Sequence, residues 1–113
     1  MKIAHVCTYW PIGTGLSLYL DNLISGMRAH RPDRHTVLAE VGSAPALTDA
    51  VECIPCYSSK QDFVEGIAAA ARKVQPDVAI IQYTPDMLGN DNRMPRLVAR
   101  LRELGIRPAR GLC

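Results

Sequence analysis

The sequence has no long hydrophobic run. Five largely apolar residues separate Lys2 from Thr8, whereas the core of a signal peptide has roughly 7–15. No stretch approaches the ~18 consecutive apolar residues of a transmembrane helix. We therefore expect a cytoplasmic protein with no transmembrane segment.

The sequence also has few of the cysteine and histidine residues that bind structural zinc or form disulfide frameworks. A structural zinc site needs four ligands, and the one C-x-x-C pair, Cys53 and Cys56, has no second pair among the scattered histidines. Cys7 lies in an apolar segment and Cys113 is the last residue, so the four cysteines do not indicate a disulfide framework. No G-K-[ST] tripeptide is present, which excludes a Walker phosphate loop. We expect no metal and no cofactor.

The charge is small but unevenly distributed. The 113 residues carry a formal net charge of +2. From Arg93 onward there are six arginines and one acid, Glu103, a net +5, whereas the preceding residues hold seven basic and ten acidic side chains, a net −3. No aromatic residue interleaves the arginines, which favours a solvated helix face over a nucleic-acid surface. We expect no specific nucleic-acid partner.

The apolar pattern alternates between strand-like and helix-like segments. Strands are expected at 2–7, 35–41, 51–54 and 77–83, and amphipathic helices at 16–29, after 59–62, and at 94–104. Four consecutive apolar residues in DVAIIQY are typical of a parallel sheet covered on both faces. The alternation predicts an α/β fold, a Rossmann-like three-layer domain with a mostly parallel sheet of four strands, the first and fourth of them central.

Single residues mark the ends and contacts of these helices. Ser59 and Asp62, three residues apart, resemble the capping box found at helix N-termini. Gly105 is the natural C-terminal cap of the last helix. Gly26 lowers helix propensity inside the first helix, so we expect it to mark close packing on the sheet.

The end of the sequence does not continue the pattern. After the last helix the chain reads IRPARGLC, and arginine, proline and glycine are unfavourable in a buried central strand. We therefore assign a Rossmann-like domain to 1–106 and an atypical tail to 107–113, and interpret the domain as truncated. An open sheet edge and an uncovered apolar face around Leu97, Leu101 and Leu104 would then favour a homo-oligomer.

A turn with one proline and two glycines, WPIGTG, joins the first strand to the first helix. It matches the dinucleotide fingerprint G-x-G-x-x-G poorly, because the third glycine position is Leu18 and only Glu40 imitates the ribose-binding acid. The turn either only reverses the chain or brings backbone N–H groups to a phosphate. We favour a phosphate loop at Gly13, Thr14 and Gly15, because open α/β sheets bind ligands at the carboxyl ends of their strands.

Two further groups of residues are candidates for chemistry. Gln82, Tyr83, Asp86 and Asn90 follow the fourth strand, where they either form a turn or face the same cleft as the glycine loop. His5, in the middle of the first strand, is expected to be a satisfied core residue.

Cys53 and Cys56 have the spacing of a redox pair. A reactive pair needs its first thiol at a helix N-terminus, where the dipole lowers the thiol pKa. Residues 57–59 intervene before the expected helix, so we expect structural cysteines without a strongly depressed pKa.

Taken in order, MKIAHVCTYWPIGTGLSLYLDNLISGMRAH, PDVAIIQY and RLVARLRELGI closely resemble the N-terminal domain of GT-B glycosyltransferases of the family 4 type. Those domains open with a methionine-basic-apolar strand, a loop with proline and glycine, and an amphipathic helix. A PDVV-like strand and an arginine- and leucine-rich helix follow later. The resemblance covers residues 1–106.

The resemblance implies retaining transfer of a sugar from a nucleotide-sugar donor to an acceptor. It implies that Gly13, Thr14 and Gly15 approach the donor phosphate. It places the acceptor-side cleft at Trp10, Gln82, Tyr83 and Asp86.

Two departures from the family bear on activity. The stretch RPARGLC has no histidine where the family commonly has one, and no second domain with paired glutamates is present. We therefore expect an acceptor-side domain that does not catalyse transfer alone. The alternatives are a non-catalytic α/β module that binds a ligand or partner, and a small thiol redox protein that uses Cys53 and Cys56.

Overall fold

The computed structural model describes residues 1–7, 14–42, 51–58, 63–82 and 93–111. These residues form five strands and three helices: β1 (Lys2–Val6), α1 (Thr14–His30), β2 (Arg34–Glu40), β3 (Val51–Tyr57), α2 (Val64–Val74), β4 (Val78–Gln82), α4 (Arg93–Glu103) and β5 (Arg107–Gly111). Each element that the sequence pattern predicts is present, with ends that differ by a few residues.

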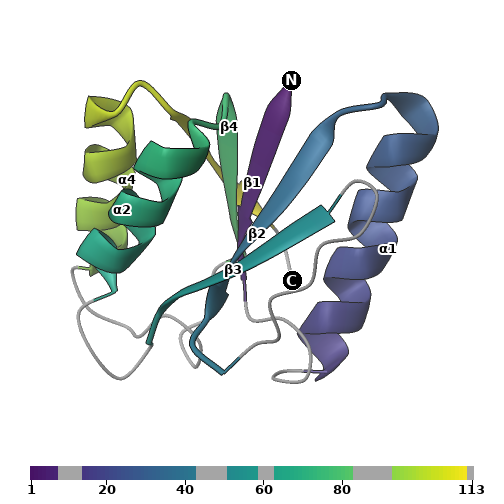
Figure 1. Ribbon diagram of the computed structural model, residues 1–113, viewed down its shortest axis with the longest axis horizontal. Helices are drawn as coiled ribbons and strands as arrows, with labels where there is room; N and C mark the ends of the chain where they lie inside the picture. Colours follow the sequence, from purple (N-terminus) through teal and green to yellow (C-terminus); the bar gives the residue numbers. More distant parts are fainter. Residues whose placement is uncertain (8–13, 43–50, 59–62, 83–92, 112–113) are drawn as a thin grey trace.

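The five strands form one parallel sheet in the order β3-β2-β1-β4-β5. The chain moves in one direction across the sheet from β1 to β2 and in the other from β4 to β5. Right-handed crossovers then require the connecting helices to lie on opposite faces. Accordingly, α1 lies on one face, and α2 and α4 lie on the other (Figure 1). The chain therefore has the predicted α/β fold, a Rossmann-like three-layer domain, with β1 at the centre of the sheet.

The core lies between the sheet and its helices, because the inner strands are apolar on both faces. Ala4 and Val6 of β1 and Ala79 of β4 are completely buried. On the α2 side, the Tyr57 and Phe63 rings pack edge to face with their centroids 6.1 Å apart. The helices contribute the large buried side chains of Leu20, Ile67, Leu97 and Leu101, and the strands contribute Leu38 and Ile81.

The chain after Gly105 forms a fifth strand, so the expected end of the sheet after four strands is wrong. Residues Arg107–Gly111 pair in parallel with Val78–Gln82. This strand is the edge of the sheet and forms its ladder on one side only, which is where a proline such as Pro108 is tolerated. The composition that disfavours a central strand is compatible with an edge strand.

The apolar face of the last helix is covered, contrary to expectation. Leu97 and Leu101 are fully buried in the core, and Leu104 is half-buried against it. The helix packs against α2 and β5. An uncovered leucine face therefore no longer supports self-association.

The helix ends agree only in part with their sequence signals. Gly105 caps α4 with a φ of 77°, and the N–H groups of Gly105 and Ile106 donate to the carbonyls of Arg102 and Leu101, which is a Schellman motif. At the other boundary, α2 begins at Val64 with Phe63 at its N-cap and no side-chain capping bond. The Ser59–Asp62 box lies outside the described residues.

The glycine that permits close packing is Gly66, and the expectation for Gly26 is wrong. A Cβ at Gly26 would meet no atom within 4 Å among the described residues. A Cβ at Gly66 would collide with the backbone carbonyl of Cys56 in β3. The helix α2 therefore lies against β3 at a distance that only glycine allows.

Candidate functional site

The strand order places a topological switch point between β1 and β4. The chain leaves the carboxyl end of β1 toward β2, and it leaves the carboxyl end of β4 toward β5 on the other side. In open α/β sheets the connections diverge at such a point and leave a crevice in which ligands bind. Val6 pairs with Ile81, so Cys7 and Gln82 follow at this edge of the sheet.

Only some of the predicted site residues lie within the part of the chain that the structure describes. Thr14 and Gly15 are the first two residues of α1, the helix that follows the carboxyl end of β1. Gln82 is the last residue of β4 and is fully buried. The remaining candidates lie outside the described residues: Trp10, Gly13, Tyr83 and Asp86. Thr14, Gly15 and Gln82 therefore follow or end the two strands of the switch point, and the burial of Gln82 gives it no exposed surface for a ligand.

The N-terminus of α1 has the electrostatics of an anion site. The first N–H groups of a helix have no partner within it, and the helix dipole adds a partial positive charge there. The first turn of α1 contains no acidic residue, whereas that of α2 contains Glu65. No carboxylate within its first turn therefore offsets the attraction of α1 for an anion.

Ser17 is a buried polar residue near the N-terminus of α1 that the sequence pattern did not indicate. It is fully buried, one turn after Thr14, and in line with Leu20 and Ile24 on the buried face of α1. The three- and four-residue spacing of the apolar side chains in this helix predicts a buried stripe that includes Tyr19, Leu20 and Ile24, yet Tyr19 is 40% exposed. The helix is therefore rotated relative to the predicted stripe, and a buried hydroxyl lies in its first turn. Spacing alone could have found Ser17, because it precedes two core residues by three and seven positions.

Two buried histidines on adjacent strands form a pair. His5 Nε2 and His35 Nδ1 are 2.9 Å apart, and the rings are stacked with centroids 5.2 Å apart. The other ring nitrogens, His5 Nδ1 and His35 Nε2, have no hydrogen-bond partner among the described residues. His5 is thus a core residue as expected, but it is only half satisfied.

Burial keeps this histidine pair neutral. It lowers the pKa of His5 to about 4, with a further contribution from His35. The pKa of His35 is lowered chiefly by burial, which outweighs the opposing effect of Asp33. In the neutral pair one ring donates its N–H to the other, so the pair holds the two strands together rather than serving as an acid or base.

The C-x-x-C thiols lie on β3 rather than at a helix N-terminus. Cys53 is buried and Cys56 is half-buried. Burial, with a smaller effect of Cys53, raises the pKa of Cys56 to about 12. A thiol with a raised pKa is a poor nucleophile at neutral pH, so this geometry agrees with structural cysteines.

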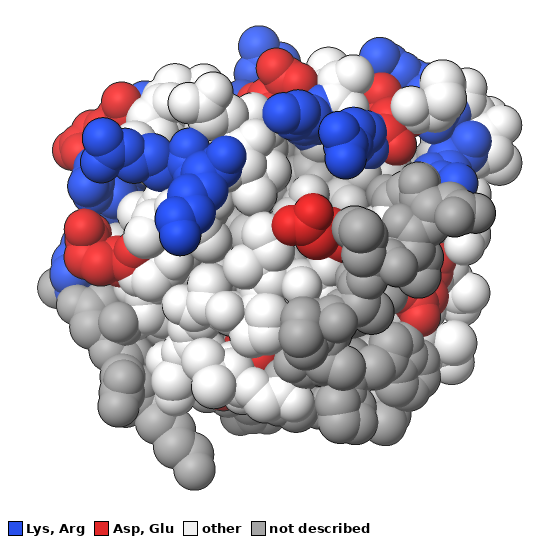
Figure 2. Space-filling view, viewed as in Figure 1, with Lys and Arg blue, Asp and Glu red and all other residues white. Residues whose placement is uncertain are grey.

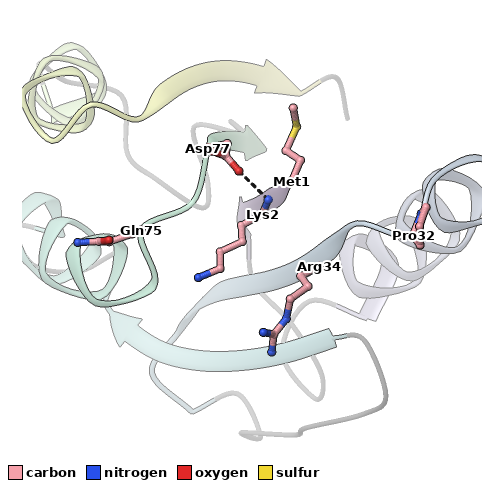
Figure 3. A pocket seen from close by; sticks show the side chains of 6 residues that line it. All are labelled: Met1, Lys2, Pro32, Arg34, Gln75 and Asp77. Atoms are coloured by element: carbon pink, nitrogen blue, oxygen red, sulfur yellow. Dashed lines mark hydrogen bonds between the residues drawn. The ribbon is translucent and has the colours of Figure 1, made fainter.

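Two hollows lie at the opposite, amino-terminal edge of the sheet. One, of about 340 Å³, is lined by Met1, Lys2, Pro32, Arg34, Gln75 and Asp77 (Figure 3). In it, the Asp77 carboxylate accepts a hydrogen bond from the backbone N–H of Lys2 at 2.8 Å. The second, of about 550 Å³, lies beside it between the ends of α2 and α4. Neither hollow contains a residue of the switch point. The strand order alone therefore indicates the carboxyl edge of the sheet as the candidate ligand-binding edge.

No model of a known protein family matches the chain, and no curated protein is significantly similar to it. Within the described ranges, no three His, Cys, Asp or Glu side chains lie close enough together to hold a metal ion. No helix formed by these residues is long and apolar enough to cross a membrane.

Proposed function

We propose that this chain is the acceptor-side domain of a retaining glycosyltransferase that uses a nucleotide-sugar donor. One observation supports the proposal: the helix that follows β1, one of the two strands at the switch point, has no acid in its first turn. The glycine loop of the sequence leads directly into that helix. The resemblance of residues 1–106 to GT-B domains supplies the reaction class.

In this proposal the domain contributes to the reaction through backbone N–H groups rather than through side chains. The N–H groups at Gly13, Thr14 and Gly15 donate to the donor diphosphate, which gains negative charge as the sugar departs. Gln82, with the cleft residues Trp10, Tyr83 and Asp86, lies on the acceptor side. The remaining nucleotide contacts and the paired carboxylates would belong to a second domain.

The small binding free energy of a helix N-terminus limits the affinity of this domain for a nucleoside diphosphate. A helix dipole contributes about 0.3–1 kcal/mol, and micromolar binding requires roughly 8 kcal/mol. We therefore expect millimolar binding of a nucleoside diphosphate. Its contacts should be confined to residues 12–17.

An NMR titration with uridine diphosphate tests the proposal. Amide shifts should appear at residues 12–17 and should disappear in Gly15→Val, whose side chain occupies the space of the ligand. Gly26→Ala, in the same helix but with open space around it, is the matched control and should bind as the parent does. Shifts confined to residues 93–110, with 12–17 unchanged, would refute a phosphate loop.

We also propose that the protein is cytoplasmic and self-associates. The outer strands, β3 and β5, each form a ladder on one side within this sheet. Unpaired strand edges are common sites of association between chains.

A further inference from the structure

We propose that the amino-terminal edge of the sheet is a docking surface for membranes that contain anionic lipid headgroups. The surface is a basic rim of six side chains: Arg28, Arg34, Arg72, Lys73, Arg102 and Arg107. It lies opposite the switch point and does not depend on the proposed sugar transfer.

The fold gathers these cations at one edge. Arg34 and Arg107 are the first residues of β2 and β5. The other four are in the last turns of α1, α2 and α4. Because strands of a parallel sheet start where the crossover helices end, all six belong to the same edge. Figure 2 shows Lys and Arg side chains along the upper part of the molecule, where Figure 1 has the N-terminus and the ends of the helices.

Three of the described acids at this edge are engaged, whereas Glu52, the second residue of β3, is exposed. Asp33 lies 3.3 Å from the Met1 amino group and 3.5 Å from Arg31. Asp77 accepts the backbone N–H of Lys2, and Glu103 pairs with Arg100 at 3.1 Å.

The six cations of the basic rim, in contrast, are available. All six are exposed, and none of them forms an ion pair with another described residue. The six cations outnumber the exposed acids Glu52, Asp77 and Glu103 of this edge, so it presents a net positive charge to an external partner.

Helix electrostatics explain only part of the basic rim. Cations in the last turn of a helix interact favourably with its dipole, which accounts for the four helical members. Arg34 and Arg107 begin strands and have no such reason to be basic.

The distribution of the charge favours a lipid surface over a nucleic acid. The cations come from five different elements across the edge rather than from one groove. Proteins that bind single-stranded nucleic acid combine cations with aromatic side chains that stack on bases. No Phe, Tyr or Trp is present among the described residues 28–34, 72–77 and 102–107. An extended array of point charges without stacking groups fits a plane of phosphate headgroups.

Co-sedimentation with vesicles tests this proposal. The parent protein should bind vesicles of phosphatidylcholine mixed with phosphatidylglycerol but not vesicles of phosphatidylcholine alone, and salt should weaken binding. The triple variant Arg72→Gln/Lys73→Gln/Arg102→Gln should lower the partition coefficient about a hundredfold, since each cation contributes about fivefold. Equal binding to both vesicles, or an unchanged triple variant, would overturn the proposal.

Single variants separate docking from folding. Arg34→Gln changes no helix end and should lower the partition about fivefold. Arg102→Gln should do the same, whereas Arg96→Gln, an equally exposed cation earlier in the same helix, should have no effect. Circular dichroism checks that each variant is folded. Tighter binding to a DNA duplex than to anionic vesicles, lost in the same variants, would replace the lipid with nucleic acid and refute the proposal.

Discussion

The buried histidine pair should make the protein sensitive to acid in a defined range. An unfolded histidine has a pKa of about 6.5, and burial lowers that of His5 to about 4. Between these values the unfolded state binds a proton that the folded state does not, so stability falls as the pH is lowered. Above about pH 6.5 both states are neutral and the effect is absent.

The magnitude follows from the size of the shift. One pKa unit corresponds to about 1.4 kcal/mol, so His5 alone should cost about 3 kcal/mol of the free energy of unfolding between about pH 6.5 and pH 4. The lowered pKa of His35 acts in the same direction. Such a loss is a large part of the roughly 5–15 kcal/mol that stabilises a typical domain.

Urea unfolding at several pH values measures this effect. The free energy of unfolding of the parent should fall by about 1.4 kcal/mol per pH unit below about pH 6.5, beyond the slope due to the carboxylates. His5→Gln keeps a polar side chain but removes the titrating ring, so its slope should be shallower. His30→Gln, at an exposed position, is the control and should have the slope of the parent. Identical slopes for the parent and His5→Gln would refute the reasoning.

The other predictions concern glycines, thiols and association. Gly66→Ala should lower the free energy of unfolding by about 1–3 kcal/mol through collision with the Cys56 carbonyl. Gly26→Ala should raise it by about 0.5–1 kcal/mol, and equal effects of the two in urea unfolding would contradict the packing described. Alkylation of Cys56 at neutral pH should be slow in the folded protein, and fast selective labelling of Cys53 or Cys56 at pH 6 would favour a redox function. Sedimentation should detect a dimer or larger species, and a monomer at high micromolar concentration would exclude self-association.

The sequence predicts the three layers of the fold because the inner strands are apolar runs and the helices have apolar residues at three- and four-residue spacing. It fails at Pro108 because local composition does not tell a central strand from an edge strand, which depends on the strand order. Similarly, no spacing distinguishes Gly26 from Gly66, since only the second meets another backbone.

The candidate site is predictable to the same extent. The carboxyl ends of β1 and β4 follow from strand alternation, but the pattern does not predict that Gln82 ends β4 and is fully buried. The partner of His5 is thirty residues away in the sequence, and the pairing depends on the register between two strands. Registers of this kind arise from the whole sheet, so sequence reasoning identified His5 and missed His35.

The central position of β1 also bears on how the chain folds. Strand β1 has neighbours on both sides, β2 and β4, and β4 begins more than seventy residues after β1 does. During synthesis β1, β2 and β3 can pair before β4, the second neighbour of β1, has been made. Contacts so distant in sequence slow folding, because a long loop must close before they form. Amides of β4 and β5 should therefore gain protection from hydrogen exchange after those of β2 during refolding.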